Sequence, residues 1–446
     1  MSRRTYADAI QCLNGLQSNF AVLDAIRKSG TAMNVLAIPE MKEWVRRCGY
    51  RTEDFDKLNI IHVSGTKGKG STCAFVESII EQYRPQYVQR IGLYTSPHLK
   101  SVRERIAING KPISEDKFTR YFFEVWDRLE SSSSDISAFP SMGVGVKPVY
   151  FRYLTLLSFH AFLSENVDTA IYEVGVGGEY DSTNVIHMPT VCAITALAID
   201  HVAVLGNTID QIAWHKAGIM KPGVPVYTLN TQPAATLDVI RQRSNEIGSP
   251  LHVCPVNTSI SEADLGIQGP AQIENASLAI EVCRAHLSKI THKQIESVPY
   301  EFRKGIASAR WRGRCETLHK NGVTYYIDGA HTKESLEGAC EWFKRQINSQ
   351  SPKVLLFNQQ SRDVSSLIKI ICDKLGQDLD RVIFSTNVTF NSGTYHPELT
   401  SLNTSKSDVE TLSVQKQLAS LWTELGGRAQ PVVASSIEEA LLHKYS

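Results

Sequence analysis

The chain has 446 residues, which is too long for one ordinary domain and suits two or three. Hydrophobic residues make up 42% of it, enough for large buried cores, and 47 basic residues nearly cancel 46 acidic ones. This balance gives no indication of a nucleic-acid or membrane-surface partner, and no apolar run is long enough to span a bilayer.

The amino-terminal residues and the cysteines together predict a cytoplasmic protein. Residues 1–6 lack the apolar core of a secretory signal, and Asp8 follows too soon for a mitochondrial transit peptide. The nine cysteines contain no C-x-x-C pair. This spacing favours reduced thiols over a zinc site or a disulfide framework.

The first strongly patterned segment is a glycine-rich loop at residues 65–71, with the sequence GTKGKGS. An apolar run at residues 60–63 precedes it and a helix-like pattern at residues 72–80 follows it. Strand, glycine-rich loop and helix form the arrangement that holds nucleotide phosphates, because glycines let backbone N–H groups turn towards phosphate oxygens. The positive end of the following helix points at the same anion.

Polar side chains within this loop strengthen the prediction. Lys69 adds a full positive charge, and Ser71 or Thr72 offers a hydroxyl for Mg²⁺. The spacing is tighter than the common G-x-x-x-x-G-K-[ST], because Gly70 separates the lysine from the serine. A flexible surface loop has a similar composition, but the flanking strand and helix favour phosphate binding.

Further along the chain, short β-like runs alternate with helix-like segments, which predicts a mostly parallel sheet covered by helices on both faces. Strands are predicted at residues 91–94, 169–174, 191–195 and 224–227. Helices are predicted at residues 114–130, 149–163, 208–217 and 272–287. A serine- and glycine-rich loop at residues 131–148 separates two of these helices.

The alternation restarts after residues 311–314. Strands are predicted at residues 325–327, 353–357, 381–384 and 432–433. The sequence therefore predicts an α/β protein with a large N-terminal P-loop domain, residues 1–304, and a smaller Rossmann-like C-terminal domain, residues 305–446.

Polar residues follow three of the predicted strands, where ligands of open α/β sheets bind. Glu173 closes one strand, His201 follows the next, and Ser96 follows the strand at residues 91–94. These three side chains are candidate Mg²⁺ ligands, because a hard cation prefers oxygen donors and tolerates one imidazole. The alternatives are a salt-bridged strand end for Glu173 and a hydrogen-bonded core residue for His201.

A succession of short motifs resembles folylpolyglutamate synthase, a member of the Mur ligase superfamily of ATP-dependent amide-forming ligases. The motifs lie at residues 65–71, 96–99, 103–106, 172–178, 181–184, 200–206, 215–219, 311–314, 328–332 and 357–360. Each is short, whereas their ordered succession along most of the chain is specific. Lys67 and the Asn358-Gln359-Gln360 run resemble the eukaryotic, and in particular the fungal, branch.

The resemblance implies a role for each of these motifs. The residues implied to hold ATP are Gly65, Thr66, Lys67, Gly68, Lys69, Gly70, Ser71, Gln272, Asn275, Arg314 and Asp328. The implied metal ligands are Ser96, Glu173 and His201, and the implied catalytic residues are Lys69, Lys216 and His331. The implied folate loop includes Ser96, Pro97, His98 and Arg103.

Three of these residues also have structural interpretations. Lys216 matches a lysine that is carbamylated in several relatives, but an ordinary exposed lysine is the alternative. Arg314 would pair with a neighbouring carboxylate, and Asp328 would cap a helix that starts near Thr332.

The activity that the resemblance implies is the ATP-dependent addition of L-glutamate to the γ-carboxyl of a folylglutamate through an acyl phosphate. ATP and Mg²⁺ are the expected cofactors, and a monovalent cation such as K⁺ is a further candidate. The expected partners are folate, L-glutamate and ATP, with no nucleic acid and no membrane, and the expected state is a monomer.

Three other functions stay open at this point. They are dihydrofolate synthase, a related ligase that joins an amino acid to another carboxylate, and a nucleotide-hydrolysing switch. A switch gives no role to Glu173, to His201 or to the run at residues 328–331.

Overall fold

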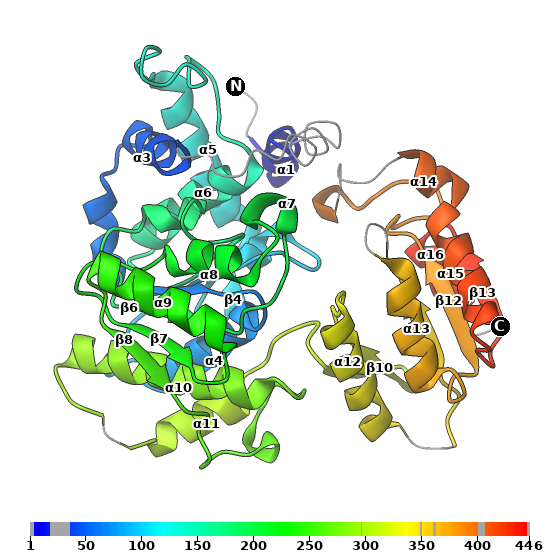
Figure 1. Cartoon of the computed structure of the whole chain (residues 1–446). Helices are drawn as coiled ribbons and strands as arrows, with labels where there is room; N and C mark the ends of the chain where they lie inside the picture. Colours follow the sequence, from blue (N-terminus) through cyan, green and yellow to red (C-terminus); the bar gives the residue numbers. More distant parts are fainter. Residues whose placement is uncertain are drawn as a thin grey trace. The chain divides into compact units, whose positions relative to one another are not determined.

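The computed structural model describes residues 4–17, 36–295, 297–347, 350–359, 363–399 and 406–443, in two compact units (Figure 1). The described residues of unit 1 run to Ile267 and then from Ala271 to Trp311, and those of unit 2 are residues 268–270 and the chain from Arg312. Residues 1–3, used for the leader prediction, and Gln360 lie outside the described residues.

The two units divide after Trp311, a few residues beyond the predicted division between residues 304 and 305. Helix α11 (Tyr300–Ser308) spans the predicted boundary and packs on α4 (Lys69–Glu81). The Ser78 hydroxyl of α4 donates to the Gly305 carbonyl at 2.7 Å. Packing on α4 therefore assigns the whole of α11 to unit 1.

Unit 1 is built on an eight-stranded sheet in the order β4-β3-β2-β5-β1-β6-β7-β8. The strands are β1 (Ile61–Ser64), β2 (Ile91–Tyr94), β3 (Ile106–Ile108), β4 (Lys111–Pro112), β5 (Thr169–Glu173), β6 (Val191–Ile194), β7 (Val226–Leu229) and β8 (Leu251–Cys254). All neighbours from β2 to β8 pair in parallel, and β3 and β4 add antiparallel pairs at one edge. The predicted mostly parallel sheet is confirmed.

Helices cover both faces of this sheet (Figure 1). The remaining helices of unit 1 are α1 (Tyr6–Asn14), α3 (Ala37–Arg47), α5 (Glu115–Ser131), α6 (Tyr150–Ser164), α7 (Val202–Leu205), α8 (Ile209–Ala217), α9 (Ala234–Ile247) and α10 (Gln272–Thr291), with 3₁₀ turns η1 (Thr52–Leu58), η2 (Val102–Arg105), η3 (Ser182–Val185) and η4 (Glu262–Asp264). Successive residues of a strand face opposite sides. Ala193 of β6 joins the core of α4, α10 and α11, while Ile194 joins that of α8 and α9.

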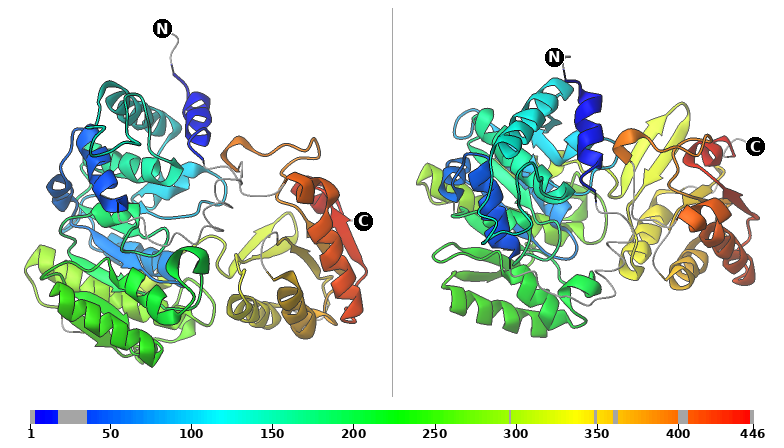
Figure 2. Two further views of the ribbon diagram at one scale, coloured as in Figure 1. Left: turned by 45° about the horizontal axis from the view of Figure 1, so that its top comes forward. Right: turned by 90° about the horizontal axis from the view of Figure 1, so that it is seen from above.

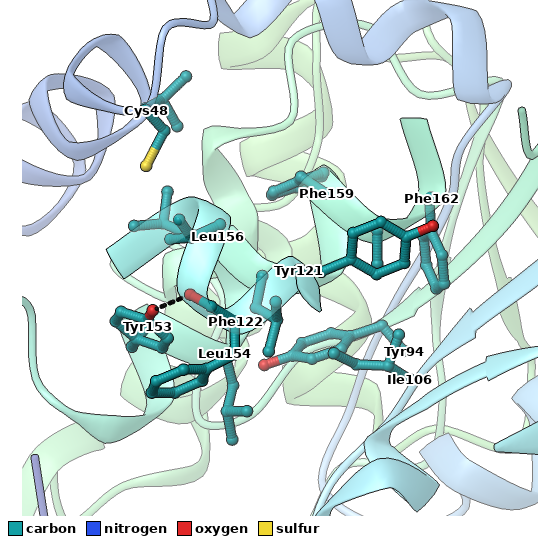
Figure 3. Close-up of a cluster of buried hydrophobic side chains, with 14 of the residues drawn as sticks. Cys48, Tyr94, Ile106, Tyr121, Phe122, Tyr153, Leu154, Leu156, Phe159 and Phe162 are labelled. Atoms are coloured by element: carbon teal, nitrogen blue, oxygen red, sulfur yellow. Dashed lines mark hydrogen bonds between the residues drawn. The ribbon is translucent and has the colours of Figure 1, made fainter. Parts of the chain in front are cut away.

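An aromatic core between α5, α6 and the sheet fixes the ends of β2 and β5 (Figure 3). The Phe122 and Tyr153 rings lie 4.9 Å apart, and the Tyr153 hydroxyl donates to the Phe122 carbonyl at 2.8 Å. Phe159 stacks on Tyr172 of β5 at 4.7 Å. Each fully buried ring stabilises the fold by roughly 1.5–3 kcal/mol, so the strands that carry the candidate ligands have a rigid base.

Unit 2 contains a two-stranded and a three-stranded sheet (Figure 2). Strands β9 (Glu316–Lys320) and β10 (Val323–Ile327) are antiparallel, and β11 (Val354–Phe357), β12 (Arg381–Ser385) and β13 (Pro431–Ala434) are parallel. The helices are α12 (Lys333–Gln346), α13 (Val364–Leu375), α14 (Lys406–Thr411), α15 (Ser413–Glu424) and α16 (Ile437–Leu442), with the 3₁₀ turn η5 (Pro397–Leu399). Their core includes Leu367, Phe384 and Trp422.

Two whole-chain properties complete the description. All nine cysteines, each in the described part of the chain, are free thiols. Among the described helices, none combines the length and the apolar character that crossing a lipid bilayer requires.

Candidate active site

The glycine-rich loop joins β1 to α4, and the segment that follows β6 holds it in shape. The backbone N–H groups of Thr66 and Lys67 both donate to the Ala196 carbonyl at 3.0 Å. The Thr66 hydroxyl donates to the Ala198 carbonyl at 3.1 Å and accepts from its N–H at 3.2 Å. Since β1 and β6 are neighbours, the loops at their carboxyl ends form one hydrogen-bonded pair.

Two glycines in the loop stand where no other residue fits. Gly65 has φ +141° and Gly68 has φ +85°, values that L-residues rarely adopt. A Cβ on Gly65 would lie 1.8 Å from the Thr195 Oγ1, and a Cβ on Gly68 would lie 2.1 Å from the Asn275 Oδ1. The loop therefore packs too closely on Thr195 and Asn275 to accept a side chain at either glycine.

The first turn of α10 supplies the other wall of the loop. Asn275 donates through Nδ2 to the Gln272 Oε1 at 3.0 Å, and both side chains are buried. Asn275 also contacts Gly68, and the Trp311 indole lies against Gly70, where an added Cβ would be 3.0 Å from the Nε1 atom. The structure thus brings Gln272 and Asn275 to the glycine-rich loop, about 200 residues away in sequence.

Three lysines surround the loop. The Lys69 and Lys216 Nζ atoms both donate to the Gly65 carbonyl, at 3.0 and 2.8 Å. The Lys67 Nζ lies 3.6 Å from the Asp200 carboxylate. The Lys69 ammonium group beside the N-terminus of α4 favours an anion at this loop.

Lys216 is buried, with 2% of its surface exposed, so its interpretation as an ordinary exposed lysine is wrong. Burial, and then the charge of Lys69, lowers the pKa of Lys216 to about 7. Its side chain therefore carries a substantial neutral amine fraction at physiological pH.

On the other side of β1, Glu173 and Ser96 lie together. Glu173 ends β5, is 5% exposed, and accepts a hydrogen bond from the Ser96 N–H at 3.0 Å. β2 and β5 are neighbours, which is why residues far apart in sequence meet here. Glu173 thus lies at the carboxyl edge of the sheet, which is where a metal ligand was predicted.

His201 lies in the segment between β6 and α7, next to Asp200. It is exposed, with φ +52°, and its N–H donates to the Asp200 carboxylate at 2.8 Å. The core interpretation of His201 is therefore wrong, and the side chain stands on the segment that contacts the glycine-rich loop.

The donor set fits Mg²⁺ better than a soft metal. The Glu173 carboxylate and the Ser96 and Ser71 hydroxyls are hard oxygen donors. Within the described ranges, no three His, Cys, Asp or Glu side chains gather as a metal site of their own. A cation at Glu173 would thus share its coordination with hydroxyl, water and phosphate oxygens, as Mg²⁺ does in nucleotide sites.

The loop at residues 96–105 is closed on itself by Glu104. Its carboxylate accepts the N–H groups of Leu99, Lys100 and Ser101 at 2.8, 3.2 and 3.2 Å. This ring of hydrogen bonds shapes the loop that the sequence assigned to folate, including the exposed Pro97.

In unit 2, Arg314 and Asp328 lie on the strands β9 and β10 or just beside them. The Asp328 carboxylate accepts the Cys315 N–H at 2.7 Å, and Arg314 donates to the Gly313 carbonyl at 2.9 Å. The backbone of Gly329 is tied to the same turn, since its N–H donates to the Gly313 carbonyl at 2.9 Å. Both predicted ATP residues therefore belong to one hydrogen-bonded turn.

His331 follows this turn, with its Nδ1 2.8 Å from the Gly329 carbonyl. Helix α12 is capped by Thr332, whose hydroxyl accepts the Ser335 N–H at 3.4 Å. The interpretation of Asp328 as the helix cap is therefore wrong.

Comparison with known proteins identifies the family. No sequence model of a protein family matches the chain. The folylpolyglutamate synthase of Saccharomyces cerevisiae (strain ATCC 204508 / S288c) is 49% identical over 451 residues, covering 99% of this chain and 82% of the yeast protein. The chain belongs to the folylpolyglutamate synthases. The resemblance predicted from the ordered motifs is confirmed.

Solved folylpolyglutamate synthases share the fold. The Mycobacterium tuberculosis enzyme complexed with ADP and AMPPCP has a TM-score of 0.66 and 23% identity, covering 92% of this chain and 94% of that one. A folylpolyglutamate synthase with AMPPCP and folate has a TM-score of 0.63 and 22% identity, covering 96% and 99%. The predicted fold class is confirmed.

Two residues of this folylpolyglutamate synthase site lie in predicted motifs but were given no role of their own. The first is Arg105, whose Nε donates to the His98 Nδ1 at 2.9 Å and whose guanidinium lies 5.6 Å from the Tyr150 ring centroid. The predicted folate-loop residue Arg103 instead donates to the Ile113 carbonyl at 3.0 Å. The Arg103-Glu104-Arg105 run offered two arginines as candidates, and the sequence alone did not distinguish between them.

The second is the Asp181 carboxylate, which shapes the turn after Glu173. It accepts the Val176 N–H at 3.0 Å, and the Thr183 N–H and hydroxyl at 3.0 and 2.6 Å. The Thr183 hydroxyl in turn lies 2.9 Å from the His62 Nε2 of β1. Burial raises the pKa of Asp181, and these donors offset that cost.

Proposed function

We propose that the chain is an ATP-dependent ligase that adds L-glutamate to the γ-carboxyl of folylglutamates. The observation that carries the proposal is Lys69, which contacts the Gly65 carbonyl in a strand–loop–helix site of this family, with the buried Lys216 beside it. Such a site favours a nucleoside triphosphate whose terminal phosphoryl group is transferred.

The chemistry follows from what amide formation needs. A carboxylate is a poor electrophile, because its negative charge repels an amine. A carboxylate oxygen of the folate attacks the γ-phosphorus of ATP, the bond to the β-phosphate oxygen breaks, and ADP leaves an acyl phosphate. The glutamate amine then attacks the acyl carbon, loses a proton, and expels phosphate. Lys69 acts by positioning and neutralising the phosphates.

Glu173, with Ser96 and His201, is proposed to hold Mg²⁺ beside these phosphates. When bound, Mg²⁺ supplies positive charge that offsets the negative charge of the transferred phosphoryl group. A monovalent cation such as K⁺ belongs to the proposal as a further cofactor.

Lys216 is proposed to be carbamylated. A neutral amine is the form that adds to CO₂, with loss of a proton, and the lowered pKa of Lys216 keeps that form available. The resulting carboxylate would add an oxygen donor near the Gly65 carbonyl, to which the side chain now points.

The proposal assigns the remaining substrates as follows. Gln272 and Asn275 contact the adenine side of ATP, and Arg314 and Asp328 also bind ATP. His331 acts beside the incoming glutamate. The loop at residues 96–105 binds folate through His98, Arg103 and the Arg105 guanidinium, which suits an acidic substrate. The larger unit is thus the ATP- and folate-binding domain and the smaller one the glutamate-ligase domain, while a monomeric state and a cytoplasmic location stay predictions.

Glu173→Gln should raise the Mg²⁺ concentration for half-maximal activity at least about tenfold, since it removes a full charge from a cation site while keeping the shape. The measurement is an ADP-release assay across a Mg²⁺ titration. Glu77→Gln is the matched control, because Glu77 is a half-buried carboxylate of α4 that accepts the Gly110 N–H at 3.1 Å. An unchanged titration in Glu173→Gln, equal to the control, would assign Glu173 to a structural role.

The proposed function is tested by the choice of acceptor. Purified protein is given ATP, glutamate and either tetrahydrofolate monoglutamate or dihydropteroate, with products read by mass spectrometry. We expect extension of the monoglutamate and poor use of dihydropteroate, whose carboxylate stops one glutamate short of the γ-phosphate. Equal or better use of dihydropteroate would make the enzyme a dihydrofolate synthase, and turnover of neither would indicate a ligase for another carboxylate.

A further inference from the structure

An open surface pocket of about 590 Å³, called the cavity below, lies on the face of α11 that points away from α4, and all of its lining residues are exposed. Phe302, Gly305 and Ile306 of α11 are buried towards α4, so the other side of the helix is left for the cavity. In Figure 1, α11 lies at the lower edge of unit 1. The lining residues are Ala263, Asp264, Tyr300, Arg303, Lys304, Ala307, Ser308 and Arg310.

Two arginines of the cavity are held by backbone and hydroxyl oxygens rather than by carboxylates. Arg303 donates to the Ser259 carbonyl at 3.0 Å and to its hydroxyl at 3.3 Å. Arg310 donates to the Ala307 and Ala309 carbonyls at 3.0 and 2.7 Å. These neutral acceptors orient both guanidinium groups without cancelling their charge.

The glycine at position 266 makes room for one of these groups. A Cβ on Gly266 would lie 2.2 Å from the Arg310 Nη1 and 2.3 Å from the Ala309 carbonyl. The Gly266 N–H also donates to the Ile306 carbonyl at 2.9 Å. The chain segment under Arg310 is therefore tied to α11, so the guanidinium has a fixed support.

The charge of the lining is positive. Arg303, Lys304 and Arg310 face a single carboxylate, Asp264, within the lining. One oxygen of that carboxylate, Oδ2, accepts the Ser261 N–H and hydroxyl at 2.7 and 2.8 Å, so this oxygen is held by Ser261. In a chain whose net charge is only +1, this is a local concentration of cations.

We infer that this cavity binds an anion with two or more carboxylate or phosphate groups. Oriented guanidinium groups bind such anions through paired N–H donors, and Lys304 adds a mobile third cation. The small side chains of Ala263, Ala307 and Ser308 leave room for a ligand. The Tyr300 ring, 74% exposed, offers a flat surface at the rim.

The cavity shares no residue with the proposed ligase site, and the choice of a poly-γ-glutamyl chain as one source of the anion rests on the proposed function. Two sources present the same chemistry: a poly-γ-glutamyl chain, which carries one carboxylate per residue and one more at its end, and a polyphosphate. Tri-γ-L-glutamate and tripolyphosphate are therefore the probes, each titrated by calorimetry into the full chain saturated with MgADP at fixed ionic strength.

We expect saturable binding to the unchanged chain, and at least about tenfold weaker binding to the Arg303→Gln/Lys304→Gln variant, since it removes two of the three cations of the lining. The single variant Lys304→Gln changes one exposed lysine, so it should fold normally, and it should weaken binding severalfold. Lys289→Gln, which removes one exposed lysine of α10 outside the cavity, should leave binding unchanged.

The preferred probe identifies the source of the anion, carboxylate or phosphate. The inference is overturned if neither probe binds saturably, or if the cavity variants bind as the Lys289→Gln control does. Turnover with tetrahydrofolate is measured separately, so a failure here leaves the proposed function untouched, and a failed acceptor test leaves this inference standing.

Discussion

Lys69→Ala is expected to lose at least about 100-fold of turnover while the protein stays folded, because contacts to charge that develops in a transition state commonly contribute that much. The Lys69 Nζ donates to the Gly65 carbonyl of its own loop, at 3.0 Å, and the residue is half-buried at the start of α4. Its loss therefore removes a charge from the anion site rather than a part of the core.

The measurement is single-turnover ADP formation with saturating ATP. Thermal unfolding of the original chain and of Lys69→Ala is measured alongside. Lys57→Ala is the control, since Lys57 is an exposed lysine of η1 outside the loop. Lys67→Ala should lose less, because Lys67 is paired with Asp200 at 3.6 Å. More than about a tenth of the original turnover in Lys69→Ala would contradict the role given to this lysine.

The sequence predicts the centre of the sheet better than its edges. β1, β2, β5 and β6 are buried at every position, so each appears as an apolar run bounded by polar or glycine residues. No residue of β8 is fully buried, and β9, which reads Glu-Thr-Leu-His-Lys, exposes most of its residues. Such strands are set by pairing with a neighbour rather than by their own composition, so the sequence does not mark them.

The domain boundary shows the same limit. The pattern of residues 300–308 indicates a helix with one apolar face, but it does not say which unit that face will contact. The structure shows that this face packs on α4 of unit 1. Gly305 lies so close to α4 that a Cβ added to it would be 2.5 Å from the Ile79 Cα.

For the site, the strand-end rule predicts which residues meet when they follow adjacent parallel strands. Ser96 and Glu173 meet in this way, at the ends of β2 and β5. The contacts of Asn275 with Gly68 and of Trp311 with Gly70 come from helix packing on α4 and from the chain path after α11. Neither has a periodicity or spacing that a single sequence reveals.

Gly68→Ala should be at least as damaging as the loss of Lys69. The residue has φ +85°, where an alanine costs about 1–2 kcal/mol in backbone strain. The new methyl would also lie 2.1 Å from the Asn275 Oδ1, in a buried corner where Asn275 is bonded to Gln272. Either the loop or the start of α10 must shift, and a displacement of about 1 Å in a phosphate site costs on the order of 100-fold in rate.

Gly248→Ala separates the two causes. Gly248 follows α9 with φ +75°, and an added Cβ there meets nothing within 4 Å, so it carries the backbone strain alone. Urea unfolding should show a loss of about 1–2 kcal/mol in Gly248→Ala with unchanged turnover, and a larger loss in Gly68→Ala with turnover reduced at least about 100-fold. If the two variants lost equal stability and Gly68→Ala kept its turnover, the close fit between the glycine-rich loop and α10 would have no part in holding ATP.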